Sequence, residues 1–115
     1  MIVLSKPVML NENSDFRRVY ARGKSFASPA VVTYVFKNRI GYNRFGITAG
    51  KKIGNSVERN RSRRVIRAAF LELHDSFEKG YDIIFVARGK TKYLKSTAVK
   101  KAIYEQLRSA GVIKK

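Results

Sequence analysis

The chain has 115 residues, of which 44% are hydrophobic, and it carries a formal net charge of +17 at pH 7. This length is typical of a single domain, and the apolar fraction excludes a disordered tail. The absence of cysteine excludes disulfides and thiolate metal sites. Because charge of one sign destabilises a compact fold, its excess indicates a polyanionic partner, with nucleic acid the first candidate and an anionic membrane surface the second.

The sequence also indicates the cellular compartment of the protein and its number of domains. The longest apolar run, residues 83–87, is far shorter than a membrane span. The first residues lack the basic, apolar and small-residue pattern of a secretory signal. We therefore expect a cytoplasmic protein with no membrane partner. We expect residues 1–115 to form one domain, with residues 1–10 and 112–115 flexible.

A short helix is predicted over the segment "NSDFRRVYARG", residues 13–23. Its first residues include good capping side chains, and Gly23 suits its end. Phe16, Val19 and Tyr20 fall at i, i+3 and i+4, so they share one face of this helix.

The periodicity changes to two from Ser25 to Lys37, which predicts a strand. A second strand is predicted over residues 44–50, after a polar connection that contains glycine. We expect these two strands to form an antiparallel hairpin. An additional short strand over residues 25–27 stays open as an alternative.

Two helices and a strand are predicted in the second half of the chain. Asn55 can cap a helix that runs to about Leu73, and Glu58 follows three residues later, as in a capping box. The run "YDIIFVA", residues 81–87, is apolar on both faces, as expected for a buried strand. A last helix is predicted over residues 96–110.

The expected order of elements is therefore α-β-β-α-β-α. With the additional short strand over residues 25–27, this order predicts an α+β fold, an α/β sandwich in which helices pack on a small mixed four-stranded sheet.

The central helix divides into an apolar and a basic side when residues 57–73 are placed at about 100° per residue. The apolar side comprises Val65, Ile66, Ala69, Phe70 and Leu73. The opposite side carries Asn60, Arg63, Arg64 and Arg67, flanked by Arg59 and Arg61. A merely solvated face would intersperse glutamates, whereas guanidinium groups bind phosphate bidentately. The row predicts a nucleic-acid interface, with a solvated basic face as the alternative.

No protein active site is predicted. His74 is the only histidine, and the helical wheel places it toward the solvated side. The 8 acidic residues are scattered along the chain, whereas a two-metal nuclease needs several converging carboxylates. We therefore expect no catalytic residue and no metal ligand in this chain.

The segment "KKIGNSVERNRSRRVIRAAF" resembles the signature of the protein subunit of bacterial ribonuclease P. The core of that signature is Arg59-Asn60-Arg61, followed by Arg63, Arg64 and Arg67. Three further segments are similar to the family's first helix, central strand with its turn, and last strand, namely "DFRRVYARGKS", "RFGITAGKKIGN" and "YDIIFVARG". The resemblance covers roughly residues 10–110.

The resemblance implies a function in tRNA processing. Ribonuclease P removes the 5′ leader from precursor tRNA, and its RNA subunit performs the hydrolysis with Mg²⁺. The protein would be the non-catalytic subunit of this endoribonuclease, binding the catalytic RNA and the leader. The protein itself would bind no cofactor and need no obligate protein partner. The resemblance also implies a left-handed βαβ crossover through the basic helix, against the usual rule.

The resemblance assigns two sets of site residues. The set that binds the catalytic RNA comprises Lys51, Arg59, Asn60, Arg61, Arg63, Arg64 and Arg67. The set that binds the precursor leader, in a cleft between the first helix and the sheet, comprises Phe16, Tyr20, Tyr34, Thr48, Lys52, Ala87 and Arg88. Two positions depart from the family pattern: Tyr20 stands where phenylalanine is frequent, and Gly50 where a small polar residue is common.

Alternatives remain for both the site and the function. On spacing alone, Phe16 and Tyr20 are core residues of an amphipathic helix. A structural RNA-binding protein of the ribosomal type would share the basic charge, and a nuclease that acts without RNA is a third hypothesis.

Overall fold

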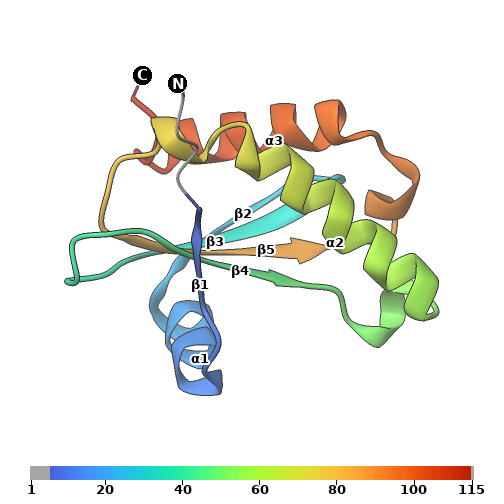
Figure 1. Cartoon of the computed structure of the whole chain (residues 1–115), viewed down its shortest axis with the longest axis horizontal. Helices are drawn as coiled ribbons and strands as arrows, with labels where there is room; N and C mark the ends of the chain where they lie inside the picture. The colour runs from blue at the N-terminus through green and yellow to red at the C-terminus, as the bar shows by residue number, and fades with distance from the viewer. Residues whose placement is uncertain (1–5, 115) are drawn as a thin grey trace.

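The computed structural model describes residues 6–114, with helices on both faces of one sheet (Figure 1). In chain order the elements are β1 (Val8–Met9), α1 (Asn13–Arg22), β2 (Lys24–Ala27), β3 (Val31–Lys37), β4 (Arg44–Thr48), η1 (Lys51–Ile53), α2 (Ser56–Leu71), η2 (His74–Ser76), β5 (Tyr81–Ala87), η3 (Thr91–Tyr93) and α3 (Ser96–Ser109). Helices α2 and α3 lie together above the sheet in Figure 1, and α1 lies below it.

The sheet is mixed and has the strand order β1-β4-β5-β3-β2. β4 is parallel to both β1 and β5, whereas β3 is antiparallel to both β5 and β2. The α+β class is confirmed, but the sheet has five strands where four were expected. The short strand that the sequence left open is β2, and β1 is the additional one.

The predicted hairpin between β3 and β4 is wrong, because β5 lies between these two strands. β5 is apolar on both faces, and its residues from Asp82 to Phe85 are buried. Burial of both apolar faces stabilises such a strand most in the centre of a sheet, where helices cover both faces. The connection between β3 and β4 therefore passes β5, a strand that comes much later in the sequence.

Helix α2 connects the parallel neighbours β4 and β5. In Figure 1 both strands run to the right, with β4 in front of β5, and α2 returns above them. This arrangement is the left-handed crossover that the family resemblance implied, and most βαβ units have the opposite hand.

Alternating residues divide the sheet between two hydrophobic cores. On β3, Val31 and Val35 face the larger core beneath α2 and α3, whereas Tyr34 and Phe36 face α1. An aromatic stack joins the sheet to α2 in the larger core, with ring centroids 4.9 Å apart for Phe45–Phe70 and 5.3 Å for Phe70–Phe85. The smaller core contains Leu10, Val19 and Ile84.

The predicted start and apolar side of α2 are confirmed. The backbone N–H of Glu58 donates to Asn55 Oδ1 at 2.9 Å, and Glu58 Oε1 accepts from the backbone N–H of Asn55 at 3.1 Å. Ile66, Ala69 and Phe70 are fully buried. The helix ends at Leu71, slightly before the predicted end.

At both ends of the chain, residues that were expected to be flexible pack against the rest of the domain. Val8 and Met9 form β1, and Leu10 is buried against Val19 and Ile84 in the smaller core. At the other end, Val112 and Ile113 pack in the larger core. Apolar side chains at both ends therefore complete the two cores, while residues 1–5 and 115 lie outside the described residues.

A buried carboxylate fixes the register of β4 against β5. Asp82 is fully buried and is the cross-strand partner of Arg44. Arg44 donates from Nε and Nη2 to the two carboxylate oxygens at 2.9 and 2.8 Å, and Asn38 Nδ2 donates at 2.9 Å. The outer side of the same guanidinium lies 3.6 Å from Asp15 on α1. One arginine therefore links both parallel strands to the helix below them.

Replacing Arg44 with Met tests this link. We expect the free energy of unfolding to fall by about 3 kcal/mol, because the variant leaves the Asp82 carboxylate buried without its cation. Arg39→Met, at an exposed position in the β3–β4 loop, is the control and should change it by less than about 0.5 kcal/mol. Urea unfolding measures both, and equal stability of the two variants would contradict the assigned role.

Candidate nucleic-acid interface

The arginine row lies on the outer side of α2, as the sequence predicts. We call this surface the arginine face; it comprises Arg59, Asn60, Arg61, Arg63, Arg64 and Arg67. Asn60, Arg64 and Arg67 are exposed, and Arg63 is half-buried. Since the opposite side of the helix is committed to the larger core, these groups are held outward by packing.

Three arginines of the arginine face also donate hydrogen bonds within the protein. Arg63 donates to Asn60 Oδ1 at 3.0 Å and to the carbonyl of Ala49, at the end of β4, at 3.4 Å. Arg61 Nε donates to the Lys92 carbonyl at 2.7 Å, and Arg59 donates to Ser56 Oγ at 3.2 Å. These contacts orient the guanidinium groups and leave other N–H donors of each available to phosphate.

A second ion pair ties the start of α2 to the loop after β5. Lys92 Nζ lies 2.7 Å from Glu58 Oε2 and donates to the Ile53 carbonyl at 2.7 Å. Gly54, directly after Ile53, has φ +142°, a backbone conformation that favours glycine, and a Cβ there would also meet the Glu58 carboxylate. The hydrogen bond from Lys92, with that from Asn55, lowers the pKa of Glu58 below its ordinary value.

Lys51 and Lys52 lie on η1, directly before α2, and both are exposed. The structure thus places these two lysines beside the start of the arginine face, where the helix dipole also favours anions. Gly50 precedes them with φ −73°, and a Cβ built on it meets no atom within 4 Å. Crowding therefore does not explain why a glycine stands here.

Four of the predicted leader-binding residues lie together between α1 and the sheet. Tyr20 and Tyr34 make an edge contact with ring centroids 4.9 Å apart, and Phe16 lies 6.5 Å from Tyr20. The hydroxyls of Tyr20 and Thr48 share a hydrogen bond of 3.4 Å. We call Phe16, Tyr20 and Tyr34 the aromatic cluster. Tyr20 is exposed, whereas Phe16 and Tyr34 are partly buried against the smaller core. All three rings therefore leave some of their surface open to solvent.

The two remaining positions from the end of β5 are placed differently. The Ala87 side chain packs in the larger core, on the opposite face of the sheet from the aromatic cluster, and Val86 packs on the face of the cluster. This placement of Ala87 differs from the expected one because side chains alternate along a strand. Arg88 is exposed, and its Nη1 donates to the Ser28 carbonyl at 3.1 Å.

The prediction for His74 is wrong. Its side chain is only 10% exposed and lies against the rings of Phe45 and Phe70, with centroids 6.2 and 6.4 Å away. α2 ends at Leu71, so the helical wheel does not apply to position 74. His74 therefore belongs to the packing beneath α2.

Sequence reasoning missed the part of the site around Gly46. A Cβ on Gly46 would lie 2.7 Å from Phe16 Cε1, so the ring of Phe16 rests directly on the β4 backbone. A glycine inside the predicted strand "RFGIT" was the available signal, since such glycines often mark a close approach. A groove of about 720 Å³ extends from this point to α2, and it is lined by Met9, Leu10, Phe16, Gly46, Ile47, Val57, Asn60, Arg63, Arg64 and Arg67.

The described part of the chain offers no metal centre. Among residues 6–114, no group of three histidine or acidic side chains could hold a metal ion. Within the same range, no helix is long and apolar enough to cross a membrane. The chemistry that these residues present is cationic and aromatic.

A basic α+β domain with an outward arginine row and a partly exposed aromatic cluster is typical of nucleic-acid-binding proteins. Comparison with known proteins narrows this class. The ribonuclease P family matches residues 4–111. The chain therefore belongs to the ribonuclease P protein component family, whose members are the protein subunit of a ribonucleoprotein endoribonuclease.

Individual relatives agree with this assignment. The ribonuclease P protein component of Clostridium botulinum (strain Langeland) is 38% identical over 104 residues, covering 90% of this chain and 94% of the relative. That of Clostridioides difficile (strain 630) is 46% identical over 84 residues, covering 72% and 74%. The RNase P protein structure from Staphylococcus aureus has a TM-score of 0.79 at 35% identity, covering 94% of this chain and 99% of that one. The structure from Thermotoga maritima has a TM-score of 0.77 at 27% identity, covering 88% and 96%.

The Glu58–Lys92 pair predicts a pH dependence of stability. Because folding lowers the pKa of Glu58, its ionised form stabilises the fold above the ordinary value of 4.5, and this contribution disappears as the pH falls through the folded-state pKa. The parent should exceed Glu58→Gln in stability at pH 7, and the difference should shrink below about pH 4.5. Urea unfolding at several pH values measures it, with Glu105→Gln on α3 as the control. A difference that stays constant down to pH 3 would contradict the role of the charge.

Proposed function

We propose that the arginine face binds the catalytic RNA subunit and that the aromatic cluster binds the 5′ leader of precursor tRNA. The observation that carries the proposal is the separation of two unlike surfaces on one rigid domain. One surface is a helix face of guanidinium groups, and the other is a set of rings between α1 and the sheet. The protein would thereby hold the leader while the RNA subunit performs the hydrolysis.

The chemistry of the arginine face supports binding to a folded RNA. Planar guanidinium forks bind phosphate oxygens bidentately, and RNA presents phosphates in fixed arrays. The contacts of Arg61 with Lys92 and of Arg63 with Ala49 hold two of these forks at set positions. Lys51 extends the charge to the start of α2.

The aromatic cluster supports binding to a single strand. The leader varies in sequence between tRNA genes, and ring stacking tolerates every base because each base has a π-face. Lys52 and Arg88, both exposed, would add charge for the leader phosphates. Ala87 would contribute through its backbone at the end of β5, since its side chain faces the larger core.

Mg²⁺ is proposed as the cofactor of the ribonucleoprotein, bound by RNA. Two carboxylates near these surfaces are already engaged in ion pairs, Glu58 with Lys92 and Asp82 with Arg44, which supports this division. The cytoplasm is the proposed compartment, because it holds the precursor tRNA of a bacterial cell. No obligate protein partner is proposed.

Removing two arginines tests the interface with the RNA subunit. Arg64→Ala combined with Arg67→Ala should weaken assembly, and should flatten the slope of log affinity against log salt by about 1.4 to 1.8. Filter binding of the RNA subunit at several salt concentrations measures this change. The control removes two exposed cations from the other end of the domain, Lys37 and Arg39. Equal slopes for the two double variants would exclude the arginine face as the interface.

A matched pair of tyrosines tests the leader site, because Tyr20 and Tyr104 are both 39% exposed. Within the reconstituted ribonucleoprotein, Tyr20→Leu should weaken binding of leader-bearing precursor by about 1 kcal/mol, roughly fivefold, through loss of one stacked base. Binding of mature tRNA should not change, and Tyr104→Leu should affect neither RNA. An equal loss for precursor and mature tRNA would indicate a folding defect and contradict the assigned role.

A further inference from the structure

A separate hollow of about 320 Å³ lies on the face of the sheet that carries α3, at the end of that helix. α3 ends at Ser109, and Ala110 after it lines one side of the hollow. The floor is formed by Phe26 of β2, Val35 of β3 and Tyr81 of β5, which also pack in or against the larger core. We call this hollow the strand-end pocket.

The strand register explains why basic side chains surround this apolar floor. Lys24 is the cross-strand partner of Val35, and Lys37 is the partner of Tyr81. Directly opposed residues share one face of a sheet, so both lysines lie on the same face as the floor. Arg22, at the end of α1, completes the rim of the pocket. All three cations are exposed.

These three cations have no partner in the part of the chain that the structure describes. Among residues 6–114, no ion pair or hydrogen bond engages the side chains of Arg22, Lys24 and Lys37. Lys92 and Lys100, by contrast, each pair with a glutamate. No acidic residue lines the pocket. Three cations around one hollow repel each other, and a bound anion would relieve this repulsion.

The end of α3 beside the pocket has its carbonyl groups occupied. The Gln106 carbonyl accepts from the N–H of Ala110, and the Leu107 carbonyl accepts from those of Val112 and Ile113, at 2.9 to 3.1 Å. This closed turn is of the kind that ends many helices. Because these carbonyls are already hydrogen-bonded, the helix end repels an anion less than an uncapped one would.

We propose that the strand-end pocket binds a free nucleoside diphosphate or triphosphate. The two aromatic rings of the floor suit a base, because every base has a π-face that can stack on a ring. The three cations of the rim suit a polyphosphate, since a diphosphate group carries about three negative charges near neutral pH. An RNA strand would bring only one phosphate for each base. The volume is near the lower end of the range of ligand pockets, about 300 to 1,000 Å³, and so fits a single nucleotide.

The ligand of this pocket is distinct from the RNAs of the proposed function. The floor of the pocket lies on the side of the larger core, whereas the aromatic cluster lies on the side of the smaller core. None of the residues that line the pocket belongs to the arginine face. A nucleotide can therefore bind while both RNA surfaces are occupied, and the proposal does not depend on them.

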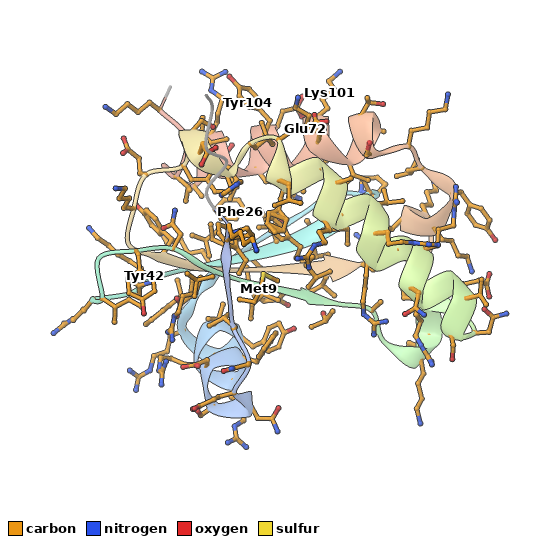
Figure 2. All side chains as sticks on the ribbon, in the orientation of Figure 1. Met9, Phe26, Tyr42, Glu72, Lys101 and Tyr104 are labelled. Atoms are coloured by element: carbon orange, nitrogen blue, oxygen red, sulfur yellow. The ribbon has the colours of Figure 1, made fainter. Side chains whose placement is uncertain are left out.

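The test follows the binding of ATP to the full-length protein through the ring signals of Phe26 and Tyr81 in NMR spectra. Lys24→Glu reverses one charge of the rim. Lys101→Glu is the matched control, because Lys101 is also exposed but lies outside the pocket. Figure 2 shows Phe26 between the sheet and α3, and Lys101 on the outer side of that helix. Both variants lower the net charge equally, so unspecific attraction of ATP falls equally. Titrations at about 0.15 M salt screen distant charges.

We expect ATP to shift both ring signals to saturation. Lys24→Glu should weaken this binding about tenfold and Lys101→Glu less than about twofold, because the effect of a charge falls with distance. Adenosine and inorganic triphosphate should each bind at least about tenfold more weakly than ATP, since each lacks one half of the ligand. Phe26→Leu should weaken binding of ATP but not that of triphosphate, through loss of the stacked base.

Four results would overturn the proposal. Ring signals that ATP does not shift, or an equal loss of affinity in Lys24→Glu and Lys101→Glu, would mean that ATP does not bind in the pocket. Equal affinity for ATP and inorganic triphosphate would mean that the pocket does not bind a base. A single-stranded oligonucleotide without terminal phosphates that binds as tightly as ATP would assign the pocket to RNA. Urea unfolding of Lys24→Glu excludes a folding defect as the cause of any loss.

Discussion

The buried carboxylate of Asp82 is the constraint on which the arrangement of both surfaces depends. A carboxylate without solvent exposure is stable only when its hydrogen bonds are complete, and Arg44 and Asn38 complete them. The hydrogen bond to Asp82 raises the pKa of Arg44 further above its ordinary value, so the cation persists at every physiological pH. Because Arg44 also contacts Asp15, the position of α1, and with it the aromatic cluster, is set by the same group that aligns β4 with β5.

The parallel pair β4 and β5 then determines where the arginine face lies. α2 must return from the end of β4 to the start of β5, and the stack of Phe45, Phe70 and Phe85 fixes which side of the helix faces the sheet. The remaining side carries the guanidinium groups into solvent. The fold thus tolerates a net charge of +17 by directing the densest cations away from both cores, where a polyanion can neutralise them.

The arginines differ in what they do within the protein, and this difference bears on how substitutions are interpreted. Arg61 donates to the backbone of the η3 segment, and Arg63 donates to that of Ala49, directly after β4. Removing either would therefore disturb a neighbouring segment as well as the proposed contact with RNA. Arg64 and Arg67 are exposed on the same face, so their substitution tests the proposed RNA binding more directly. The Glu58–Lys92 pair has a related role, since it joins the start of α2 to the segment that Arg61 contacts.

The sequence by itself determined the features that depend on local periodicity: the capped start and apolar side of α2, the outward arginine row, and the doubly buried β5. It could not determine that β5 separates β3 from β4, that β1 completes the sheet, or that His74 lies against Phe45. Those outcomes depend on contacts between segments far apart in the chain, where hydrophobic burial selects among pairings that are locally equivalent. The groove beside Ile47 belongs to the same class, because only the tertiary structure brings the edge of β4 opposite the arginines of α2.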